Sequence, residues 1–164
     1  MPAAEWFVAA GISNVDLYRA WERGAVAEVP NGALWDSVRI TTRLGHDVVR
    51  RLQSNGVDLG PVLEAPLRGA LEFLVPLGTA ASWPSLTATF PTQRGYTLCP
   101  PPHMTATSGL RSTGARRWIV PPLAPATTDG DLLCEAVAAV SATRAIAILA
   151  KAGRGELARR RTSP

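Results

Sequence analysis

The spacing of apolar residues predicts two helices in the first third of the chain. One contains Leu17 and Trp21, a helical turn apart, and it follows a serine that suits a helix start. The other contains Leu44, Val48 and Leu52, which recur every four residues and therefore define one apolar face. Each helix is expected to pack this face against a core.

Short apolar runs separated by turn residues predict a sheet. Residues 25–41 have the pattern of two strands joined at the Pro-Asn-Gly turn of residues 30–32. Further strands are expected within residues 60–63, 71–75, 86–90, 96–99 and 118–120. Residues 100–115 form a long loop rich in Pro, Ser, Thr and Gly, and loops of that length in a domain are usually functional or disordered.

A last apolar helix is expected after Thr128, whose side-chain oxygen suits a helix cap. Leu133, Val137 and Val140 would form its buried stripe. The whole pattern predicts an α+β fold, a single domain with a mostly antiparallel central sheet flanked by helices. The domain is expected to span residues 1–150, followed by a basic, flexible tail at 151–164.

The length and composition are those of a globular chain. It has 164 residues, of which 46% are apolar and 18% charged. The N-terminus lacks the basic segment of a signal peptide. The apolar stretch 136–150 is interrupted by Arg144 and is shorter than the roughly 20 residues of a membrane span. We therefore expect a cytoplasmic protein that does not contact a membrane.

Positive charge is concentrated in two regions. The tail holds five basic residues and one acid, Glu156, so its net charge is +4. This equals the formal net charge of +4 of the whole chain. In addition, no acidic residue occurs between Glu72 and Asp129, a stretch that contains four arginines. An acid-free basic stretch suits contacts with phosphate groups. The alternative is a proline-rich loop in a protein that uses arginine freely.

The sequence offers little for metal-dependent catalysis. Two-metal phosphoryl transfer needs converging carboxylates, and an Asp-x-Asp pair on a strand places two of them on one face. Here Asp36 is followed two positions later by Val38, which binds no cation. The two cysteines and two histidines show no metal-binding spacing, and no phosphate-binding glycine motif occurs. We expect no metal and no cofactor.

Three segments resemble a known family. These are Leu67–Pro76, Arg94–Pro102 with Arg117–Pro121, and Leu34–Val38. Their order and their turn residues are similar to the N-terminal domain of bifunctional DNA primase/polymerases of bacterial plasmids and phages. The resemblance implies the fold of archaeo-eukaryotic primases.

The same resemblance implies lost catalysis. The family's phosphate-binding histidine matches Ala70, the partner of its first metal acid matches Val38, and no acid matches its third carboxylate. Asp36 is the one family position that keeps its acid. The implied state is a pseudoenzyme.

These observations favour a non-catalytic, primase/polymerase-like domain with a regulatory or accessory role. The expected partners are single-stranded or duplex DNA, or another protein. Two alternatives stay open: an active primase/polymerase or nucleotidyltransferase that uses Asp36 with Glu64 or Glu72, and a protein-interaction subunit without a nucleic-acid role.

The predicted recognition surface lies at the end of the long loop. Loops on a rigid scaffold often carry binding residues, and this one ends in an arginine cluster. The structural alternative is that Arg116 or Arg117 pairs with an acid such as Glu64 or Glu72 across the sheet. The predicted binding residues are Tyr96, Arg111, Arg116 and Arg117.

Overall fold

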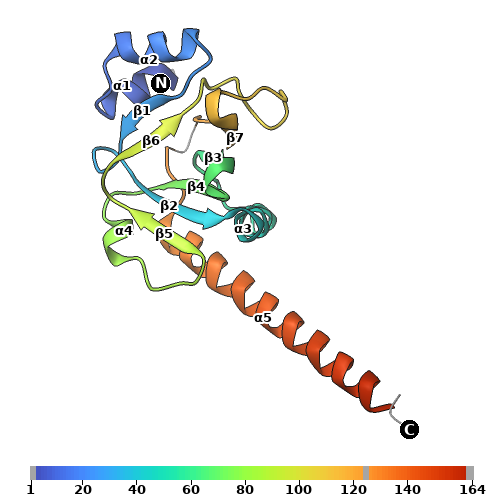
Figure 1. Cartoon of the computed structure of the whole chain (residues 1–164). Helices are drawn as coiled ribbons and strands as arrows, with labels where there is room; N and C mark the ends of the chain where they lie inside the picture. The colour runs from blue at the N-terminus through green and yellow to red at the C-terminus, as the bar shows by residue number, and fades with distance from the viewer. Residues whose placement is uncertain (1–2, 124–125, 162–164) are drawn as a thin grey trace.

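Helices and strands alternate along most of the computed structural model, which describes residues 3–123 and 126–161 (Figure 1). The elements are α1 (Ala3–Ala9), α2 (Asn14–Glu22), β1 (Ala27–Pro30), β2 (Asp36–Thr41), α3 (Thr42–Ser54), β3 (Val62–Ala65), η1 (Pro66–Arg68), β4 (Ala70–Val75), α4 (Thr79–Ser82), β5 (Thr89–Thr92), β6 (Tyr96–Cys99), η2 (Thr113–Ala115), β7 (Arg117–Val120) and α5 (Gly130–Arg161).

The described residues form two sheets. Five strands pair in the order β5-β2-β4-β3-β7, and every neighbouring pair is antiparallel. β1 and β6 pair antiparallel as a separate two-stranded sheet. The expected α+β domain with an antiparallel sheet packed against helices is confirmed, and each expected strand run contains a strand.

The central sheet separates two hydrophobic cores. Alternate residues of a strand point to opposite faces, so β2 and β4 contribute to both sides. Val38, Ile40 and Phe73 pack on the side of α3 and α5. Leu63 and Leu74 pack on the other side with Trp35, Trp118 and Phe7, under α1, α2 and the β1–β6 sheet. Figure 1 shows α1 and α2 at the end of the molecule opposite to α5.

Helix starts follow the sequence in one case and depart from it in another. The Ser13 hydroxyl accepts a hydrogen bond from the Asp16 amide at 3.1 Å and caps α2, as expected. Thr128 does not cap α5, and that prediction is wrong. Its hydroxyl is buried and accepts from the Gly60 amide at 3.0 Å, whereas Asp129 accepts from the Leu132 amide at 2.9 Å. Asp129 is therefore the cap.

The expected flexible tail is helical as far as the structure describes it. α5 continues without a break from Gly130 to Arg161, and residues 162–164 lie outside the described part. The stretch Gly130–Glu156 is 27 residues long and, by length and composition alone, could cross a membrane. The expectation that this helix is too short is therefore wrong. Its N-terminal half, however, contributes Leu133, Val137 and Val140 to the core.

One ion pair holds the middle of α5 against α3. The Arg144 guanidinium donates to Asp47 Oδ2 at 2.8 Å through Nε and to the Arg43 carbonyl at 2.8 Å through Nη2. Arg50 also pairs with the Asp47 carboxylate. The hydrogen bond from Arg144 lowers the pKa of Asp47, although burial opposes this shift. The contact of Arg144 with α3 is thus an ion pair, and the described side chains further along α5 are exposed.

We predict that this contact gives folding stability a local pH dependence. A carboxyl whose pKa is lowered on folding stabilises the fold above its unfolded pKa, and the contribution is lost as pH falls through the folded value. Arg144→Gln should therefore destabilise the protein at neutral pH and have a shrinking effect below a pH of about 4. Urea unfolding across pH measures this.

The matched control is Arg154→Gln, which removes the same charge further along α5. Its effect should be small at every pH. A loss of stability in Arg144→Gln that stays constant down to strongly acidic pH would contradict the role given to Asp47.

Candidate functional site

Two of the predicted binding arginines clamp one carboxylate. Arg117 on β7 donates from Nε to Glu64 Oε2 at 2.5 Å, and Arg111 in the preceding loop donates to the same oxygen at 3.2 Å. Glu64 lies on β3, paired with Arg117 across the sheet. Arg111 also donates to the Ala115 carbonyl at 3.1 Å. These arginines therefore fasten the loop to the sheet; the structural alternative anticipated the pair of Arg117 but not that of Arg111.

Arg116 lies inside the molecule. Its side chain is 8% exposed, and Nη1 donates to Glu72 Oε2 at 3.4 Å and to the Leu98 carbonyl at 3.3 Å. Thr97 Oγ1 lies 3.4 Å from the other oxygen of Glu72. The prediction that Arg116 lines an exposed surface is corrected, because a buried carboxylate on β4 requires a buried cation beside it.

Asp36 is hydrogen-bonded to the start of α4. It is 2% exposed, and its Oδ2 accepts hydrogen bonds from the backbone amides of Gly78 and Ala80 at 2.9 and 3.0 Å. These amides belong to the start of α4, where helical amides lack partners within the helix. Asp36 therefore anchors α4 on the end of β2.

The three acids that could serve catalysis point to different places. Arg39 faces Glu72 across the β2–β4 register and Asp36 faces Val75, so Asp36 and Glu72 occupy opposite faces of the sheet. Glu64 shares the face of Asp36 but pairs with Leu71, about 13 Å along β4 from Val75. No group of three or more metal-binding side chains converges among the described residues.

An open hollow at one end of the sheet holds two arginines for which the described part of the chain shows no ion pair. It is lined by Arg39 on β2, Arg68 on η1, Ala70 on β4 and Phe90 on β5. Arg39 pairs with Phe90 on one side and with Glu72 on the other, so all three side chains share one face. The Phe90 ring is 54% exposed. We call these four residues the basic hollow.

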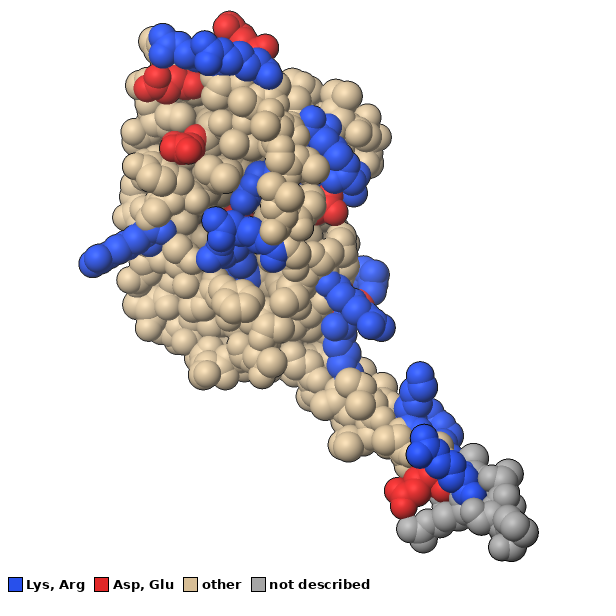
Figure 2. Space-filling view, viewed as in Figure 1, with Lys and Arg blue, Asp and Glu red and all other residues tan. Residues whose placement is uncertain are grey.

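A second hollow adjoins the first at Arg68. It is lined by Val26, Ala65, Leu67, Arg68, Leu98, Thr113, Gly114 and Arg116. The buried Glu72 forms an ion pair with Arg116 of this hollow and is the register partner of Arg39 of the first hollow. Figure 2 shows basic side chains gathered in the middle of the molecule, over β2 and β4. The two hollows together retain excess positive charge.

Tyr96 flanks this region. It is 60% exposed on β6, two positions from Leu98, which lines the second hollow. Residues two apart on a strand point to the same side, so the Tyr96 ring lies on the side of the hollow, about 7 Å along the strand from Leu98. Of the four predicted binding residues, Tyr96 is the one that is exposed on the side of this hollow and takes part in no ion pair with Glu64 or Glu72.

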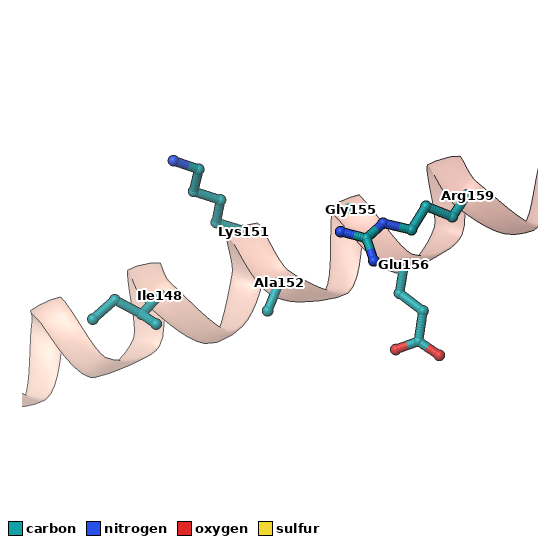
Figure 3. A pocket seen from close by; sticks show the side chains of 6 residues that line it. All are labelled: Ile148, Lys151, Ala152, Gly155, Glu156 and Arg159. Atoms are coloured by element: carbon teal, nitrogen blue, oxygen red, sulfur yellow. The ribbon is translucent and has the colours of Figure 1, made fainter.

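Another hollow lies along the far half of α5 (Figure 3). Its lining comes from this one helix, and in the view Lys151 and Glu156 point to opposite sides of it. No second element closes it, so it is the surface of a projecting helix and not a ligand cavity. The lining residues are Ile148, Lys151, Ala152, Gly155, Glu156 and Arg159.

Sequence reasoning missed Arg39, Arg68 and Phe90 as candidates. Arg39 alternates with apolar residues in its strand, which is a signal that its side chain faces away from the core. Nothing local, however, indicates that Phe90 stands beside it, because their proximity depends on the pairing of β5 with β2.

Comparison of the chain with family models, with curated proteins and with solved structures finds no match. The resemblance to primase/polymerase domains consequently stays an interpretation of the residues themselves.

We predict that Arg116 is needed for folding. Arg116→Ala leaves the Glu72 carboxylate buried without its cation, which should lower the free energy of unfolding by about 3–5 kcal/mol. Replacing both partners, as in Glu72→Leu with Arg116→Met, should recover most of that loss, since the apolar pair leaves no charge uncompensated. Chemical denaturation of the three proteins tests this. A double variant as unstable as the single one would show that Arg116 acts in another way.

Proposed function

We propose that this chain is a nucleic-acid-binding domain with an accessory or regulatory role, related to the primase/polymerase fold and without its catalysis. The observation that carries the proposal is the basic hollow, where Arg39 and Arg68 stand beside an exposed Phe90 and no carboxylate lines the opening. The adjoining hollow likewise contains no acid among its lining residues, and its Arg116 is already paired with Glu72.

The charge of this face suits phosphate groups. Glu72 is 4% exposed and already has the Arg116 guanidinium and the Thr97 hydroxyl beside it. Arg39 and Arg68 lie at the opening, so their charge is directed to whatever approaches from solvent. One guanidinium group can donate two parallel hydrogen bonds to the oxygens of a phosphate. This geometry makes arginine more suitable than lysine at such a surface.

The exposed aromatic rings favour a single-stranded ligand. Bases that are not paired stack on aromatic side chains, and this interaction tolerates any sequence. Phe90 lies in the basic hollow itself and Tyr96 lies beside the adjoining one. A positively charged groove with stacking rings is the arrangement that such binding requires. Single-stranded DNA or RNA is therefore the ligand class that we propose.

The lack of catalysis is supported by the positions of the acids. Asp36 anchors α4, Glu64 holds Arg111 and Arg117, and Glu72 compensates Arg116. Each carboxylate thus has a structural role, and no two of them share a cleft in which two metal ions could be bound about 4 Å apart.

The binding proposal predicts a salt-dependent affinity that depends on two arginines. Arg39→Gln with Arg68→Gln should weaken binding of a labelled oligothymidine strand. The slope of log affinity against log salt should fall by roughly 0.7 for each lost phosphate contact, or about 1.4 in total. Fluorescence anisotropy at several salt concentrations measures both quantities.

A control with the same change in net charge is Arg23→Gln, at the residue directly after α2, combined with Arg51→Gln on α3. Both of these residues are exposed. Within the same series, Phe90→Ala should cost about 1–3 kcal/mol of binding, whereas Tyr18→Ala, an equally exposed ring on α2, should have no effect. Equal losses in the two arginine pairs would reduce the proposal to non-specific charge attraction.

The catalytic part of the proposal has its own test. Incubation with primer–template, all nucleotides and Mg²⁺ or Mn²⁺ should yield no extended product, because Val38 and Ala70 stand where the resembling family has a metal acid and a histidine. Extension that disappears in Asp36→Asn would overturn this. Asn retains the oxygen that the amides of Gly78 and Ala80 need, so this variant separates catalysis from folding.

A further inference from the structure

The two halves of α5 lie in different surroundings. The first half packs Leu133, Val137 and Val140 into the core, and Arg144 ends its contact with the body. From Ala145 onward every described side chain is exposed, including Ile146 at 67% and Leu149 at 72%. Figure 1 shows this half leaving the body with no other element beside it. At 1.5 Å per residue, residues 145–161 project over about 25 Å.

A second stripe runs along α5, away from the core-facing residues. Its positions are separated alternately by three and four residues, which is the spacing of a seam between two helices. The stripe continues from the first half into the projecting half, where Ile146 and Leu149 lie clear of the body. At its start, Leu132 and Glu135 line a hollow together with Arg51, Leu52, Asn55 and Val57, so the part that is open to a partner helix begins after them. Its members are Leu132, Glu135, Ala139, Ala142, Ile146, Leu149 and Gly153.

The projecting half contains Gly153 and Gly155, neither of which has a neighbour within 4 Å of an added Cβ, and only Gly153 lies on the stripe. A glycine inside a helix destabilises it by about 1 kcal/mol relative to alanine. A Cβ added at Gly153 would meet nothing within 4 Å, so no neighbour in this chain requires its absence. Small residues such as Ala139, Ala142 and Gly153 do permit the close approach of another backbone.

We propose that this stripe binds the same stripe of a second copy, in antiparallel orientation. The charges along α5 select that orientation. Its first two turns carry Asp131 and Glu135, whereas its last turns carry Lys151, Arg154 and Arg159 together with the single acid Glu156. A parallel pair would bring the basic ends together, but an antiparallel pair places each basic end beside the acidic turns of the other copy.

The heptad spacing gives the register of this pair. In an antiparallel seam the two kinds of seam position face each other, so Ile146 meets the second copy's Leu149, and Ala142 meets the second copy's Gly153. Because the arrangement is two-fold symmetric, each contact occurs twice. The core-facing residues Leu133, Val137 and Val140 lie on the other side of the helix from Ala142, Ile146 and Leu149, which leaves these three positions open to a second helix.

Other occupants make different demands on α5. A membrane into which the helix inserts would surround the apolar turns 145–150 on all sides. It would therefore contact Ile148 as much as Ile146. Ile148 is 68% exposed but lies about 160° from Ile146 around the helix axis, outside the stripe. Its substitution therefore distinguishes a helical partner from a surrounding medium.

Sedimentation velocity on the full chain, over a range of concentrations, tests the proposal. The wild-type chain should form a dimer. Ile146→Glu with Leu149→Glu should weaken dimerisation at least tenfold, whereas Ile148→Glu should leave it unchanged. Melting temperatures should stay equal in all three when measured at a concentration where each is monomeric, because these side chains contact no core. A monomeric wild type, or equal losses in both variants, would overturn the proposal.

Disulfide crosslinking tests the orientation. With Cys134 replaced by serine, Ala142→Cys and Gly153→Cys proteins should crosslink when mixed and should not crosslink alone. Crosslinking of either protein with itself would show a parallel pair and would overturn the antiparallel assignment. If the wild type is monomeric and instead sediments with phosphatidylglycerol vesicles, and Ile148→Glu abolishes this, then a membrane and not a second copy covers the helix.

Discussion

β2 and β4 pair in antiparallel register over Asp36–Thr41 and Ala70–Val75, and this pairing distributes side chains between two cores. Val38, Ile40 and Phe73 meet α3 and α5, while Leu74 meets the tryptophan-rich side. A shift of one residue would exchange the two sets and bury Arg39 and Glu72 against α3. The register is therefore strongly fixed by burial, and every polar contact of the candidate site depends on it.

The placement of Glu72 within this register determines how positive charge is distributed. Burial of its carboxylate requires Arg116 beside it, and Glu64 similarly engages Arg111 and Arg117. These ion pairs connect the long loop and β7 to β3 and β4. The cations left without such a partner in the adjoining hollows, Arg39 and Arg68, are those that face solvent with Phe90. The proposed binding surface thus lies where the ion pairs of Glu64 and Glu72 end.

In α5, too, contacts with the body fix one part and leave the rest exposed. Its core-facing residues and the Arg144–Asp47 pair fix the helix axis relative to the body, and the remaining turns continue along that axis into solvent. Most of the stability of helices in proteins comes from tertiary packing, and exposed apolar residues such as Ile146 and Leu149 gain none from the body of this chain. The seam toward a second copy would stabilise the turns that the body does not reach.

The local sequence determined most helices and strands, because periodicity and turn residues act over a few positions. Ser13, the face of Leu44 to Leu52 and the strand runs were all recognisable in this way. The site was not, since Arg116 meets Glu72 across 44 residues and Arg117 meets Glu64 across 53. An acid-free stretch in the sequence therefore did not mean an acid-free surface. Only the strand pairing decided which arginines are neutralised, why Asp36 anchors a helix and where Phe90 lies, because each depends on contacts between segments far apart in the chain.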